Sequence, residues 1–423
     1  RLTVLHAVTN ESLCYSIEHS DDRLGPTVAQ AVCKDSMAQI NKQIEHARLL
    51  EKFIDEEGSC PDDNPDTPGD ESKCGWFRIV ETPSEARSVI QQGKMAVVLG
   101  IEVANLFNAH ENSNLDKQYD IDVSTSCPDK TSPAFEQCIV EGEKSLCAAA
   151  GGSWCADCVT VDGASKCSVS IDKVDTHNPA LLTQAVQELS DRGVTHIFPI
   201  HNFDNAYGAA ATWMDVLAIA NAYAEQRFWK IENCESEGYG FHVDLWAEWS
   251  IAALVGFDSK MPAFPSYPTT ASCNARGLTD RGKTLLTAMM DRGMIIDIDH
   301  MGKNSFDGTL EAVKNYSRSG APYPIVATHV QFFDRNSQYY QDNLGRHERT
   351  RTAAQLRSIK DTGGMVAAML KDDTQDTPLK GEKHTIAYSK PELKYGDAIA
   401  DNCRHSSKSW AQSLQYAIDT MDG

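Results

Sequence analysis

Four residues whose side chains can bind a metal or transfer a proton each end a short aliphatic run. They are Glu102, His201, His300 and His329, in the segments VVLGIE, HIFPIH, IIDIDH and PIVATH. A carboxylate and several imidazoles at one place form a ligand set for zinc and related divalent ions, which lower the pKa of bound water toward neutrality. These residue types therefore indicate metal-assisted hydrolysis, provided that the fold brings them together.

Any one of these histidines could instead be a buried histidine that hydrogen-bonds neighbouring carbonyls, the commoner situation for a lone His. Their repeated placement at strand ends favours the metal site. A serine hydrolase is less well supported, because the sequence has no G-x-S-x-G nucleophile elbow. It also has no dinucleotide-binding fingerprint.

One recurring unit would position these residues: a helical pattern, a Gly suited to the left-handed conformation, a short aliphatic run and a polar residue. The first copy opens with a Thr82 to Glu85 capping box and Pro83 at the first helical position. The copies cover residues 82–102, 178–201, 278–300 and 352–370, and a further strand pattern covers 321–329. Helices alternating with strands in this way predict parallel strands in a barrel or an open wound sheet.

Alternation along each strand predicts which residues share a face, because residues two apart point the same way. The predicted inner sets are Glu102 with Gly100 and Val98, His201 with Pro199 and Ile197, His300 with Ile298 and Ile296, and His329 with Ala327 and Ile325. Asp297 and Asp299 are then expected on the opposite face and are not first-choice ligands. Inward residues at the carboxyl ends of parallel barrel strands converge on one mouth, so a shared polar site is expected there.

The predicted fold class is α/β, a TIM-like (β/α)8 metal-dependent hydrolase barrel with about six of its eight strands present and with Cys-rich insertions. The strands are expected near residues 2–9, 95–102, 195–201, 294–300, 324–329 and 364–370. The expected organisation is an N-terminal barrel part, a disulfide-stapled insertion, and a C-terminal barrel part with its own insertion. These cover residues 1–110, 111–175 and 176–423, with the second insertion at 202–277.

Charge excludes some partners. Lys plus Arg number 39 against 60 Asp plus Glu, a net charge of −21 that would repel nucleic acids and anionic membrane surfaces. No apolar run reaches the length of a membrane-spanning helix, so no transmembrane segment is expected. The opening RLTVLHAVTN has neither an initiator Met nor the apolar core of a signal peptide, and is read as the start of a mature or partial chain.

Thirteen cysteines, several in Gly-, Asp- and Ser-rich segments, indicate an oxidising compartment. We expect a secreted, extracellular, periplasmic or cell-surface protein. The disulfides expected from proximity are Cys14 with Cys33, Cys60 with Cys74, and Cys234 with Cys273. Six more are expected to staple the insertion at 111–175 in unknown pairing, namely Cys127, Cys138, Cys147, Cys155, Cys158 and Cys167, and Cys403 is left over.

Two further short motifs were weighed. Cys155 and Cys158 have the C-x-x-C spacing of redox motifs, but without a βαβ context a structural role is favoured. Sequons at Asn10 and Asn315 are compatible with a secreted glycoprotein.

Several segments together resemble the membrane (renal) dipeptidase family of zinc metallopeptidases, within the amidohydrolase superfamily, and more closely its larger bacterial-type members. They are VVLGIEVANLFN, THIFPIHNFDNAYGAA, CNARGLTDRGKTLLTAMMDRGMIIDIDHMG, PIVATHVQFFD and GRHERTRTAAQLRSIKDTGGMVA. The resemblance runs from about residue 75 to residue 370, and more loosely over residues 1–55.

The resemblance implies a barrel that holds two Zn²⁺ ions bridged by Glu102, with His300 and His329 on the second ion. It also implies that His201 and an arginine hold the polar and carboxylate groups of a small peptide substrate. Arg346 is the best match for that arginine, with Arg349 and Arg351 as alternatives in the same segment.

The sequence departs from the family at two places. The family's first strand carries a His-x-Asp or His-x-His pair, whereas this sequence has His6 alone in VLHAVTN. The family's last strand carries an aspartate, and the sequence stops after the helical pattern SSKSWAQSLQYAIDTMDG. We therefore expect the missing strands and ligands to come from flanking sequence or from a separate segment.

The function predicted is a secreted zinc-dependent, dipeptidase-like hydrolase that cleaves a dipeptide or similar small amide with metal-activated water, through Glu102. The alternative is a non-catalytic extracellular structural or binding protein on the same barrel. A homo-oligomer or an extracellular assembly is compatible with both. Metal bound near Glu102 would distinguish the enzyme from the scaffold.

Overall fold

The computed structural model describes the chain over residues 2–9, 36–58, 75–116, 119–126, 157–161, 164–174, 176–244, 262–263, 265–316, 320–336, 346–369 and 407–422. Several predicted features lie outside these ranges. They are the disulfides Cys14–Cys33 and Cys60–Cys74, the sequon at Asn10, the unassigned Cys403, and four cysteines of the predicted insertion, namely Cys127, Cys138, Cys147 and Cys155.

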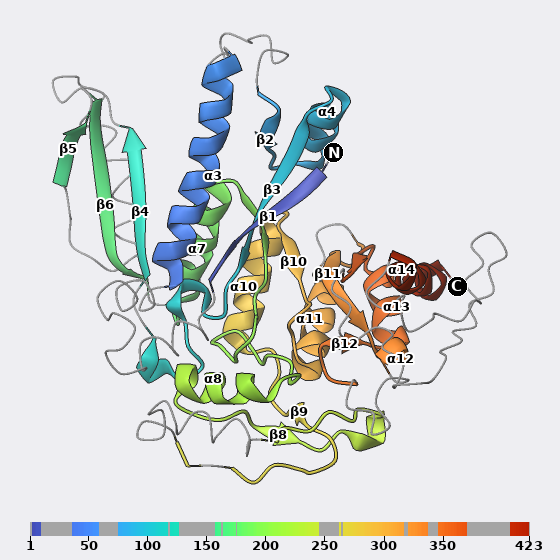
Figure 1. Cartoon of the computed structure of the whole chain (residues 1–423). Helices are drawn as coiled ribbons and strands as arrows, with labels where there is room; N and C mark the ends of the chain where they lie inside the picture. Colours follow the sequence, from blue (N-terminus) through green and yellow to red (C-terminus); the bar gives the residue numbers. More distant parts are fainter. Residues whose placement is uncertain are drawn as a thin grey trace, which may run out of the picture.

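A curled parallel sheet forms the centre of the molecule (Figure 1). Its main strands lie in the order β1, β3, β7, β10, β11, with β13 also paired to β11. Their bounds are β1 Leu2–Val8, β3 Met95–Glu102, β7 Val194–Ile197, β10 Ile295–Asp297, β11 Ile325–Phe332 and β13 Met365–Ala368. These six strands are the six that were predicted, and they form half of a TIM-like barrel. The predicted fold class is confirmed.

Two short strands extend this sheet. β2 (Phe77–Ile79) pairs with the start of β3, and β12 (Thr350–Arg351) pairs with the end of β11. Within the described residues, β1 pairs only with β3 and therefore lies at one edge of the sheet. Its apolar residues Leu2, Val4, Leu5 and Val8 are exposed. The expectation that outside sequence completes the barrel stays a prediction.

The helices between the strands begin and end where the sequence indicates. α4 (Pro83–Gln91) starts with the predicted capping box, in which Thr82 accepts a hydrogen bond from the backbone N–H of Glu85 and Glu85 accepts from Thr82. The others that border the sheet are α3 Ser36–Gly58, α7 Pro179–Asp191, α10 Asp280–Asp291, α11 Lys303–Asn315, α13 Ala353–Asp361 and α14 Ser407–Asp422. The Gly residues after α4, α7, α10 and α13 all have φ between 70° and 79°, the left-handed conformation expected of them.

The main hydrophobic core lies between the sheet and these helices. On β3, Val97, Leu99 and Ile101 contribute to it, together with Leu182 of α7 and Leu286 of α10. The opposite face of β3 carries Val98, Gly100 and Glu102, as predicted. This second face is the inner face of the half-barrel.

The predicted inner faces of β7, β10 and β11 are wrong. Ile197, Ile296 and Ile325 belong to the helix-side core. Parallel pairing instead places His196 beside Gly100 on the inner face, and Asp297 is on the same face because it hydrogen-bonds His196.

The physical reason is that the strands end before the histidines, so side chains no longer alternate strictly between the two faces of the sheet. β7 ends at Ile197 and β10 at Asp297, so His201 and His300 follow irregular backbone rather than strand. β11 has a register shift between Ala327 and Val330, around His329. The histidines reach the mouth through turns and a bulge, and the two-residue period does not describe those segments.

Two further sheets lie outside the half-barrel. β4 (Tyr119–Ser126), β6 (Ala164–Val174) and β5 (Asp157–Val161) form an antiparallel sheet of their own, drawn apart from the barrel in Figure 1. It falls within the predicted insertion at 111–175, whose boundaries and disulfides stay predictions.

The third sheet belongs to the predicted insertion at 202–277. It pairs β8 (Ile231–Glu232) with β9 (Cys273–Asn274) and follows helix α8 (Asp215–Glu225). Among the described residues, no helix is long and apolar enough to cross a membrane.

Candidate metal centre

Glu102, His201, His300 and His329 converge at the carboxyl ends of the strands. Glu102 Oε1 lies 3.1 Å from His201 Nε2, 3.3 Å from His300 Nε2 and 3.6 Å from His329 Nε2. The Nε2 atoms of His300 and His329 are 2.9 Å apart. The predicted proximity of these side chains is confirmed.

The ligand atoms of Glu102, His300 and His329 all lie within 4.8 Å of one another, in an arrangement that could hold a metal ion. Zinc bonds to nitrogen and oxygen of about 2.0–2.2 Å place neighbouring ligands of a tetrahedral ion about 3.3 Å apart. The observed separations of 2.9, 3.3 and 3.6 Å bracket that value. The donor set fits a divalent ion that accepts imidazole and carboxylate.

The protonation of the cluster suits cation binding. Burial alone would raise the pKa of Glu102, but hydrogen bonds and charge interactions with His201 and His300 outweigh it and hold that pKa below its usual value. Burial and the nearby charge of Arg349 hold the pKa of His300 well below its usual value, although its hydrogen bond to Glu102 opposes them. The cluster therefore combines a carboxylate with a neutral imidazole, the forms that coordinate metals.

Asp299 contacts His329 on the side of the ring that points away from Glu102. It is fully buried, accepts a hydrogen bond from the backbone N–H of His329, and lies 3.4 Å from His329 Nδ1. A carboxylate at Nδ1 favours the tautomer whose Nε2 carries the lone pair. Asp299 thus contacts the ring nitrogen of His329 that points away from Glu102.

Asp297 has a similar role for another histidine. It is fully buried and lies 3.0 Å from His196 Nε2. His196 Nδ1 in turn lies 2.9 Å from His6 Nε2. Burial and the neighbouring Asp299 raise the pKa of Asp297. The prediction that Asp297 lies on the face opposite to the histidines is therefore wrong, because it bonds to the imidazole of His196 on the inner face.

Phe198 lies among the histidines. Its ring contacts those of His6, His196, His300 and His329, with centroid distances of 5.2, 5.3, 6.1 and 5.5 Å. Phe198 is fully buried. It gives the cluster one apolar side.

Arg349 interacts electrostatically with two residues of this centre. Its side chain is buried, it interacts with the charges of Glu102 and His300, and its guanidinium lies over the ring of Trp213 at 4.6 Å. Its Nε has no hydrogen-bond partner among the described residues. A buried guanidinium with a free Nε is suited to binding an anionic group.

Arg346 and Arg351 have other surroundings. Arg346 is half-buried over the ring of Phe333 at 4.8 Å, among residues of a separate apolar cluster. Arg351 donates to the carbonyl oxygens of Ile298, Asp299 and Met301 and so fixes the turn that carries His300.

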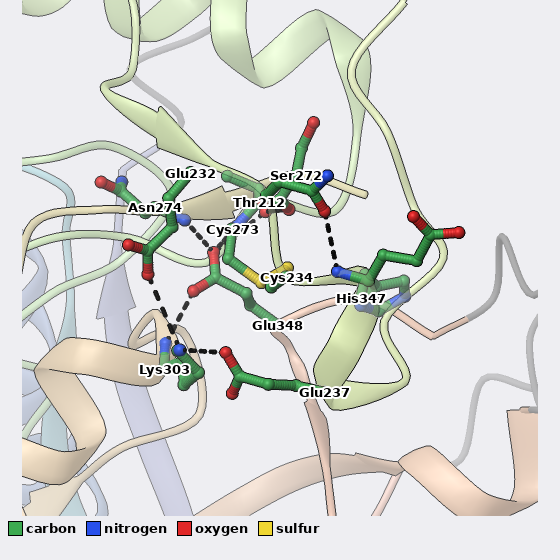
Figure 2. Close-up of a disulfide and its surroundings, with 12 residues drawn as sticks. Thr212, Glu232, Cys234, Glu237, Ser272, Cys273, Asn274, Lys303, His347 and Glu348 are labelled. Carbon is green, nitrogen blue, oxygen red and sulfur yellow. Dashed lines mark hydrogen bonds and ion pairs between the residues drawn. A yellow bond between two sulfur atoms is a disulfide. The ribbon is translucent and has the colours of Figure 1, made fainter. Parts of the chain in front are cut away.

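A buried carboxylate anchors the loop that carries Arg349, as Figure 2 shows. Glu348 accepts hydrogen bonds from the backbone N–H groups of Thr212 and Asn274 at 2.9 Å and of Lys303 at 2.8 Å. Burial raises its pKa to about 7, against the effect of these donors. Because Lys303 opens α11 just after His300, Glu348 ties the Arg349 loop to the His300 turn.

The predicted disulfide between Cys234 and Cys273 is confirmed and lies beside this anchor (Figure 2). Cys273 precedes Asn274, which donates to Glu348. The bridge closes a sequence separation of 39 residues, so it restricts the unfolded chain as well as holding this loop in place.

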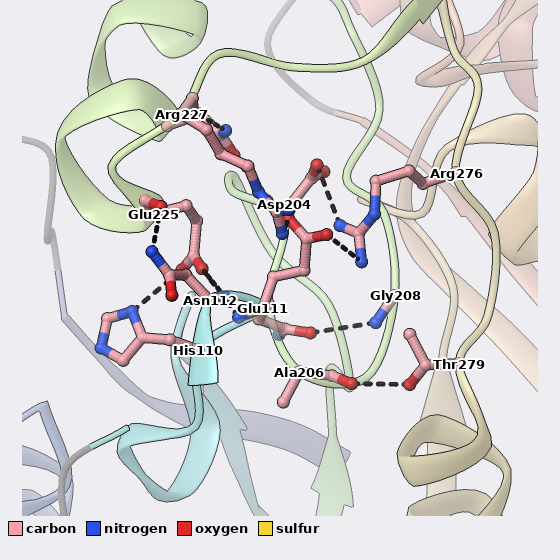
Figure 3. A network of polar contacts seen from close by, with 12 residues as sticks. His110, Glu111, Asn112, Asp204, Ala206, Gly208, Glu225, Arg227, Arg276 and Thr279 are labelled. Carbon is pink, nitrogen blue, oxygen red and sulfur yellow. Dashed lines mark hydrogen bonds and ion pairs between the residues drawn. The ribbon is translucent and has the colours of Figure 1, made fainter. Parts of the chain in front are cut away.

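The loops that follow Glu102 and His201 are held by a second network (Figure 3). Glu225, fully buried at the end of α8, accepts from His110 Nδ1 at 2.9 Å and from the backbone N–H of Glu111 at 2.7 Å. Asp204 accepts from Arg276 at 3.1 Å and from the Asn274 amide at 2.7 Å. Both loops are therefore fixed by buried carboxylates.

His347 makes stability depend on pH. Burial and the charges of Arg349 and Arg351 lower its pKa from 6.5 to about 3, so the folded chain keeps it neutral while the unfolded chain protonates it below pH 6.5. Stability is therefore expected to fall as the pH drops from about 6.5 to about 3. His347→Phe, which keeps a ring against Trp213 and Phe241, should reduce this slope by up to one proton, ~1.4 kcal/mol per pH unit.

Urea unfolding of both proteins at several pH values between 7 and 4 measures the two slopes. His46→Gln, which removes an exposed histidine of α3, is the control and should keep the wild-type slope. Equal slopes for the wild type and His347→Phe would contradict the prediction.

Sequence reasoning named His6 only as a departure from the family, missed His196 and Phe198, and gave Arg349 only as an alternative to Arg346. Gly100, inside a strand, is a usable signal for the first two, since a Cβ there would lie 2.3 Å from His6 and 3.2 Å from His196. No signal in the sequence separates Arg349 from Arg346.

Comparison with known proteins finds solved structures of low similarity to this chain. No protein-family model and no curated protein matches the sequence. A metallopeptidase described as dipeptidase AC has 11% identity and a TM-score of 0.41, over 99% of this chain and 68% of that one. A metallopeptidase from Rhodobacter sphaeroides, bound to a phosphinate mimic of L-Ala-D-Ala, has 12% identity and a TM-score of 0.40, over 99% of this chain and 69% of that one.

A probable dipeptidase from Pseudomonas aeruginosa has 11% identity and a TM-score of 0.40, over 91% of this chain and 65% of that one. These proteins are of the class that the sequence motifs resemble. Identities and TM-scores at this level do not decide an activity, which has to come from the geometry of the site.

Proposed function

We propose that this chain is a metal-dependent hydrolase of the dipeptidase type, which cleaves a dipeptide or a similar small amide. The observation that carries the proposal is the convergence of Glu102 Oε1, His300 Nε2 and His329 Nε2 within metal-sharing distance. The buried Arg349 beside them supports a substrate with a free carboxylate.

Glu102, His300 and His329 would hold the ion, for which zinc is our choice. Such an ion supplies a hydroxide at neutral pH and polarises the carbonyl that is attacked. Asp299 lies 3.4 Å from His329 Nδ1, where it favours a lone pair on Nε2, and the ring of Phe198 packs against that of His329.

The substrate would be held by two groups. His201 Nε2 lies 3.1 Å from Glu102 Oε1 and 3.2 Å from the amide of Asn202, where it can bind a polar group of the substrate. Arg349 replaces Arg346 as our proposed partner of the substrate carboxylate, because Arg349 interacts electrostatically with Glu102 and His300. The Cys234–Cys273 disulfide supports an extracellular or periplasmic location.

Metal analysis with an activity screen tests this function. Purified protein is assayed for zinc and for hydrolysis of a dipeptide panel, each dipeptide also supplied with its C-terminal carboxylate converted to an amide. We expect bound zinc, cleavage of free dipeptides, loss of activity on chelation, and weak cleavage of the amidated set. Protein that binds no zinc and cleaves no dipeptide would contradict the proposal and favour the scaffold.

A further inference from the structure

A buried guanidinium lies against the turn that carries His300. Arg351 is fully buried, and it donates to the backbone carbonyl oxygens of Ile298, Asp299 and Met301, the last two at 3.0 Å. These carbonyl groups stand on both sides of His300 in the chain, beyond the end of β10. Buried carbonyl groups need hydrogen-bond donors. Arg351 supplies donors in a segment that lies outside the strand.

The backbone of Arg351 is attached to the strand that carries the other histidine. Arg351 belongs to β12, which pairs in parallel with the end of β11, and Phe332 is its register partner. His329 lies on β11 before this pairing begins. Arg351 therefore joins the turn of His300, through its side chain, to the strand of His329, through its backbone. Since the Nε2 atoms of the two histidines are 2.9 Å apart, a shift of either element changes how they can share an ion.

Arg351 also compensates the charge of a buried carboxylate. Asp299 is fully buried and lies 3.4 Å from His329 Nδ1, and its charge interacts with that of Arg351. A buried carboxylate is costly when an opposite charge beside it is removed. Loss of Arg351 should therefore disturb the partner of His329 as well as the turn of His300.

The same segment fixes Arg349 between two anchored neighbours. On one side Glu348 accepts from the backbone N–H of Lys303 at 2.8 Å, just after His300 in the chain (Figure 2). On the other side Arg351 donates to the carbonyl groups that flank His300. The position of the Arg349 guanidinium relative to His300 is therefore set from both sides.

We propose that Arg351 is a positioning residue of the centre. It sets the separation between His300 and His329, on which metal affinity depends, and the separation of both from Arg349, on which recognition of the substrate carboxylate depends. The proposal rests on the proposed function, because the ion and the carboxylate are the ones proposed above.

An arginine suits this role better than the other long side chains. Its planar guanidinium carries several N–H donors and keeps its charge when buried. It also lies over the ring of Phe306, on the helix that follows His300, at 5.4 Å. Lysine would keep the charge but lose part of these contacts, and methionine would keep the length without donors or charge. Arg351→Lys and Arg351→Met therefore form a graded pair.

Zinc affinity, measured by competition with a chromogenic chelator, is the first test. Arg351→Met should weaken zinc binding about 10- to 100-fold, and Arg351→Lys should recover part of the loss. The absorption spectrum of the cobalt-loaded Arg351→Met protein should also differ from that of the wild type. The matched control is Arg192→Met, which removes an arginine that donates to the side chain and backbone carbonyl of Asn41. Arg192 precedes β7, at the end of the strand away from the centre, so zinc affinity should not change.

The second test is the ratio of kcat/KM for a free dipeptide to kcat/KM for its amidated form. A variant that is only less stable has fewer active molecules, which lowers both values equally and leaves the ratio unchanged. Because Arg349 would no longer be held at the right place, Arg351→Met should lower the ratio about 10-fold. Arg351→Lys should lower it less, and Arg192→Met should keep the wild-type ratio.

The outcomes separate this inference from the proposed function. Wild-type zinc affinity or a wild-type ratio in Arg351→Met would overturn the inference. If circular dichroism shows that Arg351→Met is unfolded, the same measurements on Arg351→Lys decide, and wild-type values there would overturn it. Zinc binding without hydrolysis in the wild type would overturn the proposed function, while weaker zinc binding in the Arg351 variants would still support the positioning role. A wild type that binds no zinc would overturn both.

Discussion

Replacing Glu102 with Gln is expected to lower kcat/KM for dipeptide hydrolysis at least about 1,000-fold, equivalent to ~4 kcal/mol of transition-state stabilisation. The amide has nearly the same shape but no charge. Glu102 Oε1 lies within 3.6 Å of the Nε2 atoms of His201, His300 and His329. Its negative charge is therefore the common partner of these three imidazoles. The same variant should lose bound zinc.

The matched control for this variant is Glu51→Gln. Glu51 is also a buried carboxylate, but it lies on α3, where burial raises its pKa and it accepts from the backbone N–H of Ile79. Its neutral replacement should leave zinc content and kcat/KM within a few-fold of the wild type. Full zinc occupancy and near-normal turnover in Glu102→Gln would remove Glu102 from the centre.

Replacing Arg349 with Met is expected to raise KM for a free dipeptide about 100-fold, or ~2.7 kcal/mol, with a much smaller change for the amidated dipeptide. The guanidinium is buried, interacts electrostatically with Glu102 and His300, and lies over the ring of Trp213. A buried cation of this kind compensates a substrate carboxylate that has left water. The KM of Arg349→Lys for the free dipeptide should lie between those of the wild type and Arg349→Met, since Lys keeps the charge but lacks the planar pair of donors.

Arg346→Met is the comparison that decides between the two arginines. Arg346 packs on Phe333 and has no interaction with the cluster among the described residues, so its loss should leave KM nearly unchanged. The assay compares free and amidated forms of one dipeptide for all three variants. A KM increase confined to Arg346→Met would return the carboxylate-binding role to the residue that the sequence resemblance favoured.

Local sequence signals predicted the elements well. The Thr82 capping box, the glycines after four helices and the aliphatic strands are all determined by residues close together in the chain, and all appear in the structure. The convergence of Glu102, His300 and His329 followed from the rule that parallel strands end on the same side.

The faces of the strands could not be predicted in the same way. His201 and His300 lie beyond the last paired residues, Ile197 and Asp297, and a bulge precedes Val330. Where a strand stops depends on pairing with its neighbours, which sequence alternation does not contain. The partners His6 and His196, which are 190 positions apart, required the strand order as well.

Arg349 shows a different limit. Arg346 and Arg349 stand in one short charged segment, and nothing in their local sequence distinguishes them. Their surroundings differ because Glu348 is bonded to Thr212, Asn274 and Lys303, and this anchor fixes which way the next residue points. That information comes from residues that are between 45 and 136 positions away from Glu348 in the sequence.

The burial of the histidine rings has a consequence for the acidity that the centre can tolerate. An ordinary histidine site loses its metal below about pH 6.5, because protons compete for the same nitrogen atoms. Here burial lowers the pKa of His6 and of His196 to about 4, and burial with the nearby charge of Arg349 holds that of His300 well below 6.5. Protons therefore compete poorly for these nitrogens in mildly acidic surroundings, and the centre remains able to take up a cation where an exposed cluster of histidines would have released it.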